Sequence, residues 1–198
     1  MSLRKALAQN ADSSMVLEQK LEDRILQVSI HWHKEIYAYD IHIRDITDRK
    51  IAEQKVKHLA FYHQSSNLPN QFKLREDLNS LIDNNTPFSL GLIAIRGFSQ
   101  QVSAVGVEAS AAMVNALAGL ISQHIDNGVG FYQVSDSKFA LMCTKTLNVL
   151  SLQKLTRQLS AIVEHPISTF FGDFFVELDL GFACFPQHGA SFDIILKN

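Results

Sequence analysis

The chain has 198 residues, of which 46% are apolar and 19% are charged, and its formal net charge is -2. This composition is sufficient for a normal hydrophobic core and argues against a disordered chain. The small net charge, with basic and acidic residues interspersed, gives no electrostatic reason to expect a nucleic acid or an anionic membrane as a partner.

No uninterrupted apolar run approaches the roughly 20 residues of a membrane-spanning helix, and the first residues lack the hydrophobic segment of a signal peptide. Cys143 and Cys184 lie in apolar, strand-like runs, so we expect two buried, reduced thiols rather than a redox pair. No cysteine or histidine spacing typical of a zinc site occurs. We therefore expect a cytoplasmic protein without membrane contact.

Two runs between residues 25 and 44 alternate between apolar and polar side chains, which is the pattern of half-buried β-strands. The first runs from Ile25 to His33 and the second from Ile36 to Arg44. The polar pair Lys34–Glu35 predicts a short turn between them. Two or three antiparallel strands are too few for an independent core, so we expect this part to be a fragment of a larger domain or to borrow a partner's surface.

A helix is predicted to follow these strands. Thr47 or Asp48 can accept the free N–H groups of its first turn, and Asp48 suits the positive end of the helix dipole. The helix has a stripe with 4-3-4 spacing formed by Ala52, Val56, Leu59 and His63. The stripe covers only about two heptads, so a coiled coil between two copies and an ordinary amphipathic connector both stay open.

The run Ile43-Arg-Asp-Ile-Thr-Asp-Arg-Lys-Ile-Ala-Glu53 closely resembles the end of a PAS sensor domain. In that family the last strand leads through an Asp-Ile-Thr-Asp-Arg-Lys signature into a signalling helix. The resemblance implies that residues 1–46 are the C-terminal fragment of a PAS domain and that residues 47–62 are the signalling helix. Because such helices commonly pair across a dimer, the resemblance also favours a homodimer.

The remaining sequence predicts alternating helices and strands. An amphipathic helix with apolar positions from Phe72 to Ile82 precedes an apolar strand from Phe88 to Phe98. Further helices are predicted over residues 107–125 and 150–163, and the chain ends within what we expect to be a last helix. The other predicted strands form two hairpins, one from residues 130–134 and 139–144 and one from residues 170–174 and 175–185.

Two motifs in this part resemble the GGDEF domain of diguanylate cyclases. The segment from Phe61 to Asn70 is similar to the family's opening Tyr-His-Asp-x-Leu-Thr-Gly-Leu-Pro-Asn, although it is one residue shorter and Gln64 replaces the aspartate. The segment from Leu180 to Gly189 resembles Ser-Ile-Gly-Ile-Ala-x-x-Pro-x-x-Gly. The resemblance implies an α+β fold over residues 63–198, with a mostly antiparallel sheet flanked by helices as in nucleotidyl cyclases and a truncated last helix. The β-hairpin fragment and the connector helix would precede it.

The family's Gly-Gly-Asp/Glu-Glu-Phe signature, which forms a hairpin tip, is degenerate here. The hydrophobic frame between Phe131 and Met142 resembles the family, but the tip reads Ser135, Asp136, Ser137, Lys138 and Phe139. A diguanylate cyclase joins two GTP molecules by attack of a 3′-hydroxyl on an α-phosphate, and the protein mainly holds Mg²⁺ and the triphosphates. Serine and aspartate make an acceptable turn, but they form a poorer phosphate cradle than two glycines.

The resemblance places the family's two metal-binding carboxylates on Ala94 and Ser137. Neither side chain supplies the hard carboxylate oxygen that Mg²⁺ requires, and Ile95 offers only its main-chain carbonyl. Lys138 and Arg96 replace two further acidic residues, and such cations would repel Mg²⁺ while tolerating a bare phosphate. We therefore expect that Mg²⁺ and GTP bind weakly or not at all.

Nucleotide recognition is also reduced. The family's guanine-reading asparagine and aspartate fall on Val102 and Ala111, whose apolar side chains leave the guanine edge without partners. The Arg-x-x-Asp motif of product inhibition is replaced over the span from Asp126 to Val129, so that allosteric site is not expected. Together these losses predict a GGDEF domain that is not an enzyme.

Four other groups of residues have side chains that could contribute to a site. His31, His33 and His42 could form a metal site, or they could be solvated strand histidines. His58 and His63 are both expected on the connector helix, pointing apart. The four phenylalanines Phe170, Phe171, Phe174 and Phe175 could stack on a ligand. The simpler alternative is that they pack in the core or in an interface. Ordinary surface charges are expected at Lys145, Lys154 and Arg157.

The sequence thus predicts a fragment of a bacterial cyclic-di-GMP signalling protein. Its main predicted role is that of a non-catalytic regulatory and dimerising module that relays the state of the PAS sensor to an output domain. Such domains often precede an EAL phosphodiesterase domain, which is the expected downstream partner. A GTP-binding receptor without turnover is the alternative, and a residual cyclase is a third hypothesis.

Overall fold

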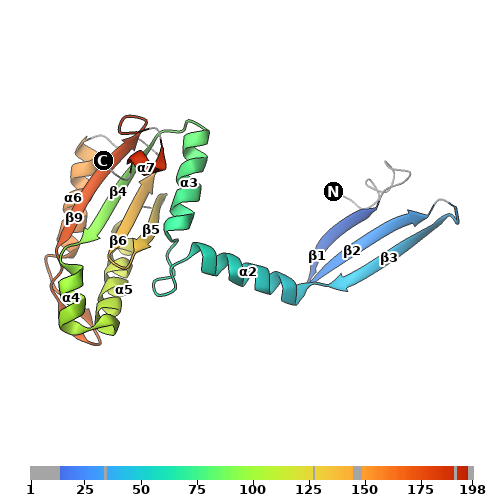
Figure 1. Cartoon of the computed structure of the whole chain (residues 1–198), viewed down its shortest axis with the longest axis horizontal. Helices are drawn as coiled ribbons and strands as arrows, with labels where there is room; N and C mark the ends of the chain where they lie inside the picture. The colour runs from blue at the N-terminus through green and yellow to red at the C-terminus, as the bar shows by residue number, and fades with distance from the viewer. Residues whose placement is uncertain (1–13, 34, 127, 145–148, 190, 196–198) are drawn as a thin grey trace. The chain divides into compact units, whose positions relative to one another are not determined.

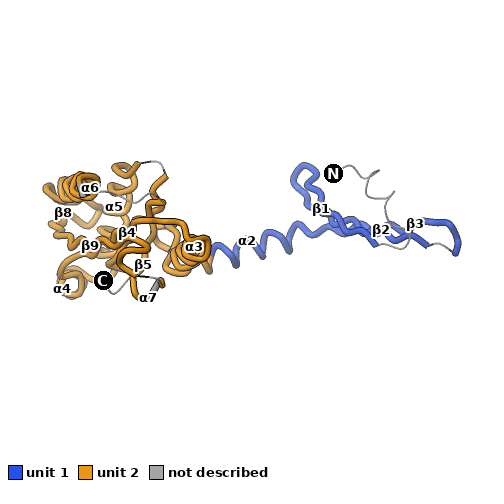
Figure 2. Tube along the Cα trace, turned by 90° about the horizontal axis from the view of Figure 1, so that it is seen from above, with its two compact units in different colours: residues 1–58 blue, residues 59–198 orange. Residues whose placement is uncertain are grey.

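The computed structural model describes residues 14–33, 35–126, 128–144, 149–189 and 191–195. The chain divides into two compact units, residues 1–58 and residues 59–198 (Figure 2). The predicted domain limits at residues 46 and 62 stay predictions. Lys145 lies outside the described residues, and so do Lys34 and Asn127.

The first unit contains a three-stranded antiparallel sheet of β1 (Met15–Leu21), β2 (Arg24–His33) and β3 (Ala38–Asp45). Ile30 pairs with Ile41 and Val28 pairs with Ile43, so the apolar positions of neighbouring strands share one face, as the alternation predicts. The predicted start of the second strand at Ile36 is wrong. The turn extends to Tyr37, which adopts a left-handed backbone with φ of 50°, and this delays β3 until Ala38.

The connector helix α2 spans Thr47–Phe61. Its predicted capping by Thr47 or Asp48 is wrong, because the Asp45 carboxylate accepts the Thr47 N–H at 3.0 Å. The Thr47 hydroxyl instead accepts the Ile25 N–H at 2.9 Å and ties the helix start to β2. The Thr47 hydroxyl also donates to the Asp45 carboxylate. This bond, and after it the bond from the Thr47 N–H, lowers the pKa of Asp45. Since α2 ends at Phe61, the prediction that His63 lies on this helix is also wrong.

The second unit is built on a four-stranded antiparallel sheet in the order β5-β6-β4-β9. Its strands are β4 (Phe88–Ile95), β5 (Val129–Ser135), β6 (Lys138–Cys143) and β9 (Leu178–Phe185). Helices α5 (Val107–His124) and α6 (Val149–Ile162) cover one face, and α3 (Gln71–Asp83) and α7 (Phe192–Ile195) cover the other (Figure 1). The predicted α+β fold, with a mostly antiparallel sheet flanked by helices, is confirmed.

Alternation along β4 produces two cores. Ile93 and Ile95 pack with α5 and α6, whereas Phe88 and Leu90 pack with α3 on the opposite face. Leu78 of α3 is fully buried there, and burial of such a side chain stabilises the fold by about 1.5–3 kcal/mol. Helices therefore pack on both faces of β4, the strand that pairs with β6 of the signature hairpin.

Three details of the predicted elements are wrong. The apolar run to Phe98 is not one strand, because β4 ends at Ile95 and Gly97, with φ of 65°, leads into α4 (Phe98–Val105). The predicted last hairpin is also different: β7 (Ile167–Thr169) pairs with β8 (Gly172–Phe174), and β9 pairs with β4. Phe72, predicted on the apolar side of α3, is 70% exposed.

Candidate functional site

The residues at the position of the family signature, Ser135 to Phe139, meet the end of β4. Ser135 ends β5, Lys138 begins β6, and the turn between them contains Ser137. The Ile95 N–H donates to the Ser137 carbonyl at 2.9 Å, and Ala94 lies opposite Lys138 in the sheet register. The structure therefore brings together the positions that the sequence assigned to the lost metal site, Ala94 and Ser137.

Ala94 lies in a row of cross-strand neighbours with Lys138 on one side and Asp179 on the other. Directly opposed residues of antiparallel strands project from the same face of the sheet. The alanine thus stands between a cation and an anion, and neither the alanine nor the Ser137 hydroxyl replaces a carboxylate ligand of Mg²⁺.

Arg96 forms an ion-pair cluster with two acidic residues of the β9 region, which the sequence analysis did not identify. Its Nη1 lies 2.8 Å from Glu177 Oε2, and its Nε donates to Asp179 Oδ1 at 3.0 Å. Hydrogen bonding from Arg96 lowers the pKa of Asp179, and Asp179 in turn raises the pKa of Arg96. The only available signal in the sequence was the placement of two acids on the same side of an otherwise apolar strand.

This cluster changes the expected electrostatics of the site. Arg96 is already neutralised, so its predicted attraction for a bare phosphate is largely cancelled. Lys138 is exposed, and it has no ion-pair partner within the part of the chain that the structure describes. Among the described residues, one cation rather than two is therefore unpaired beside Ala94, the position that the resemblance assigns to a metal ligand.

The predicted guanine-reading positions lie on two packed helices, Val102 on α4 and Ala111 on α5. Neither side chain can form a hydrogen bond to a base. The same helices carry two buried amide oxygens, Gln101 Oε1 and Asn115 Oδ1, that have no hydrogen-bond partner among the described residues. Such orphaned acceptors are uncommon in proteins.

A buried glutamine ties the signature hairpin to the loop that follows α2. Gln133 of β5 is 1% exposed, accepts a hydrogen bond from the Ser66 hydroxyl and donates from Nε2 to the Ser135 carbonyl at 3.2 Å. The Gln133 N–H donates to the Pro69 carbonyl at 2.8 Å. His63 Nε2 lies 3.7 Å from Asp136 Oδ1 at the hairpin tip. The sequence analysis missed Gln133, whose only signal is a polar residue within an apolar strand.

Asn70 joins the end of α2 to the start of α3. Its Nδ2 donates to the Ala60 carbonyl at 2.9 Å, and its Oδ1 accepts the N–H groups of Phe72 and Lys73 at 2.9 and 3.1 Å. The side chain is therefore the N-cap of α3 and also a brace for the last turn of α2. The Leu-Pro-Asn segment of the motif thus connects the connector helix, α3 and the hairpin.

The other candidate residues do not form a site. His42 Nε2 contacts Asp40 at 2.9 Å, and no group of three or more His, Cys, Asp or Glu in the described segments is arranged to hold a metal. Phe174 is buried, which agrees with core packing, whereas three neighbouring rings are exposed and form no ligand box: Phe170, Phe171 and Phe175.

Cys143 and Cys184 both lie opposite Ser89, on the two strands that flank β4, and both are free thiols. Strands are about 4.8 Å apart, so the two cysteines are separated by roughly 9.6 Å, beyond the reach of a disulfide. Cys184 is buried as expected, whereas the expected burial of Cys143 is wrong, since this residue is only partly buried; their reduced state stays a prediction. None of the helices described is long and apolar enough to cross a bilayer.

Comparisons with known proteins agree with this fold. A protein of Synechocystis sp., sll1895, is 26% identical over 186 residues, which cover 91% of this chain but only 27% of that relative. The FimX GGDEF domain of Pseudomonas aeruginosa superposes with a TM-score of 0.62 at 18% identity and covers 69% of this chain and 87% of that domain. The Vibrio cholerae LapD S helix-GGDEF-EAL structure, bound to c-di-GMP, has a TM-score of 0.56 at 15% identity, with coverages of 69% and 32%.

The family model described as diguanylate cyclase, GGDEF domain, matches residues 60–198. This match includes the sheet, its covering helices and the signature hairpin, and it begins close to the boundary between the two compact units at residue 59. The chain therefore belongs to the GGDEF-domain family of diguanylate cyclases.

Proposed function

We propose that this GGDEF domain does not synthesise cyclic-di-GMP and instead acts as a regulatory module that relays a conformational signal within a larger cytoplasmic signalling protein. The observation that carries this proposal is the row formed by Lys138, Ala94 and Asp179, in which the metal-binding position holds a methyl group between two charges.

The chemistry of the site supports the loss of catalysis. Synthesis needs a divalent cation held by carboxylates beside the triphosphate. Here Asp179 is engaged by Arg96, and Lys138 would repel a metal ion at Ala94. Loss of one preorganised charge-stabilising group commonly slows a reaction by about 10²–10³. The loss of both carboxylates, even without additivity, predicts no measurable turnover.

The contacts of the signature hairpin support a relay. The loop after α2 bonds to the hairpin through Ser66 and Gln133, and Asn70 bonds to the last turn of α2. In this proposal a displacement of the last turn of α2 reaches the hairpin through these hydrogen bonds and does not depend on an unconstrained loop. In this proposal the hairpin has lost its catalytic role and keeps a mechanical one.

The proposed partners follow from the motif resemblance and from exposed apolar surface. Val56 and Leu59 on α2 are 65% and 60% exposed, which suits pairing of this helix in a homodimer. Residues 1–46 are proposed to be the end of a PAS sensor domain, and an EAL phosphodiesterase is the proposed output domain. LapD, in which an S helix, a GGDEF and an EAL region occur together, provides a precedent for that order.

A product assay tests the proposal. The protein is incubated with GTP and either Mg²⁺ or Mn²⁺, and cyclic-di-GMP is separated by chromatography. We expect none above a metal-free blank. The triple variant Ala94→Asp, Ser137→Asp and Lys138→Glu restores the family's acidic residues; its inactivity would mean that more than the metal site is lost. Product formed by the unaltered chain would refute the proposal.

The second candidate function is a GTP receptor without turnover, and the orphaned amide oxygens favour it. Gln101 Oε1 and Asn115 Oδ1 lie on the helices that bear the predicted guanine positions, and the N1–H and amino group of guanine are donors that such acceptors need. Calorimetric titration with GTP separates the two functions. Micromolar binding that Asn115→Leu abolishes would support the receptor, whereas no heat at millimolar GTP would leave the relay alone.

A further inference from the structure

A cavity of about 430 Å³ lies at the opposite end of the sheet from the signature hairpin. Its floor is the sheet face that packs against α5 and α6, and its walls come from the end of α5, the start of β5 and α6. Ser89, on its floor, precedes Ala94 by five residues on β4, which corresponds to about 17 Å along the strand. The cavity is therefore separate from the site discussed above.

Small residues on the strands leave this space open. Ser89, Gly91 and Cys143 line the cavity, whereas Ile93, the next residue on this face of β4, is part of the packed core. A Cβ on Gly91 would approach the Phe182 ring to 2.8 Å, so the glycine allows the ring to lie across the strand. The cavity opens to solvent, since Asp126, Lys154 and Gln158 on its walls are exposed, so a ligand can reach it from outside.

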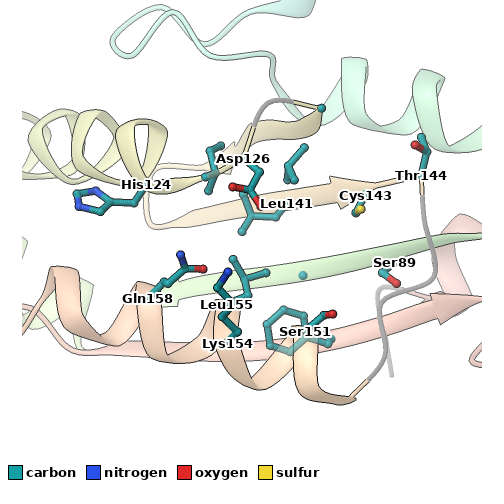
Figure 3. A pocket seen from close by; sticks show the side chains of 15 residues that line it. Ser89, His124, Asp126, Leu141, Cys143, Thr144, Ser151, Lys154, Leu155 and Gln158 are labelled. Carbon is teal, nitrogen blue, oxygen red and sulfur yellow. The ribbon is translucent and has the colours of Figure 1, made fainter.

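Two opposite charges line this cavity from different walls. Lys154 projects from α6, and Asp126 lies across from it between α5 and β5 (Figure 3). Within the described residues, neither group forms an ion pair with the other or with any other side chain. Lys154 and Asp126 therefore offer a cation and an anion to a ligand, one on each side of the strand residues Leu141 and Phe182.

We propose that the cavity binds a free α-amino acid with a large apolar side chain. The α-carboxylate of the ligand meets the Lys154 ammonium, and its α-ammonium meets the Asp126 carboxylate. The ligand's side chain lies on Phe182 and Leu155, which supply the apolar surface. The volume is in the range of known small-molecule sites, and the lining combines apolar surface with polar groups that include His124, Ser151 and Gln158.

Calorimetric titration with three matched probes tests the class of ligand. L-phenylalanine carries both charges, 3-phenylpropionate lacks the ammonium, and 2-phenylethylamine lacks the carboxylate. For a ligand of this size we expect L-phenylalanine to bind with a Kd between about 10 µM and 1 mM. Because hydrogen bonds to charged groups are the stronger ones, each analogue should bind at least about tenfold more weakly.

Variants locate the binding. Lys154→Gln and Asp126→Asn should each weaken L-phenylalanine binding about tenfold or more, and Leu155→Trp, which fills the cavity, should abolish it. Arg157→Gln is the matched control, since it removes the same charge from an exposed position of α6 outside the cavity. Thermal melts followed by circular dichroism confirm that each variant is folded.

Three results would overturn the proposal. Equal affinity for 3-phenylpropionate would make this an anion site, and no heat from any probe at about 10 mM would leave a water-filled cavity, since even weak ligands register at that concentration. Cyclic-di-GMP binding that is lost in Lys154→Gln would assign the cavity to a dinucleotide instead. Each outcome is independent of whether the chain makes cyclic-di-GMP.

Discussion

Replacement of Gln133 by leucine should weaken the link between the signature hairpin and the loop that follows α2. The Gln133 side chain is almost fully buried and makes two hydrogen bonds, one with the Ser66 hydroxyl and one with the Ser135 carbonyl. Leucine has a similar volume but cannot replace either bond. The change therefore removes polar contacts while it leaves the apolar packing of β5 largely intact.

The expected size of the effect follows from the groups left behind. A buried polar group that loses its partner costs about 1–3 kcal/mol. Ser66 still accepts the Leu68 N–H at 3.3 Å, but its O–H loses the Gln133 acceptor, so the cost is shared between that hydroxyl and the Ser135 carbonyl. We expect a net loss of about 2 kcal/mol in the free energy of unfolding, which corresponds to a fall of about 1 M in the urea midpoint.

Urea unfolding of the whole chain, followed by circular dichroism, measures this loss. Gln153→Leu on the exposed side of α6 is the matched control and should change the stability by less than about 0.5 kcal/mol. If Gln133→Leu were as stable as Gln153→Leu, the hydrogen bonds would not hold the hairpin, and the relay argument would lose its structural basis.

Three further predictions concern stability. Asn70→Ala removes the N-cap of α3 and should lower the free energy of unfolding by about 1 kcal/mol, measured by urea unfolding against Asn79→Ala at an exposed position inside the same helix. Leu78→Ala leaves a cavity in a fully buried position and should cost about 2–5 kcal/mol in the same assay; a loss below 1 kcal/mol would contradict the assigned burial. The pKa of Asp179 is lowered by Arg96, so its contribution to stability is present above its unfolded pKa near 3.9 and disappears as the pH falls through the lower folded value. Melting temperatures between pH 6 and pH 2 should therefore fall less steeply in Asp179→Asn than in the unaltered chain, and identical slopes would contradict the ion pair.

Local patterns in the sequence predicted most of the elements. The alternation along residues 25–33 sufficed for β2, and the apolar frame around the degenerate tip sufficed for the hairpin of β5 and β6. The prediction of one strand from Phe88 to Phe98 was wrong because apolar content alone does not distinguish a strand from the first turn of a helix. Arg96 and Gly97 separate the two elements, and Gly97, with its positive φ, turns the chain; one glycine carries little weight in a sequence pattern.

The charge balance of the site could not be predicted, because it depends on pairs distant in the chain. Arg96 meets Asp179 only after β9 pairs with β4, and the expectation that β9 pairs with its sequence neighbour hid that contact. Gln133 and Ser66 are 67 residues apart, so their hydrogen bond has no local signature. The pairing of β4 with the signature hairpin, by contrast, follows from the strand frame: Ala94 lies opposite Lys138 and Ile95 bonds to Ser137, while the assignment of Ala94 and Ser137 as lost metal positions stays a prediction.

Paramagnetic broadening by Mn²⁺ tests most directly whether the signature hairpin can still hold a metal with a nucleotide. NMR spectra of the isotopically labelled chain are recorded with GTP while Mn²⁺ is added at substoichiometric amounts. The account predicts no selective loss of the amide signals of Ile95, Ser137 and Lys138 compared with those of exposed residues elsewhere, such as Gln153. Selective broadening of those three signals that requires GTP would show a metal–nucleotide site at the hairpin and would contradict the account.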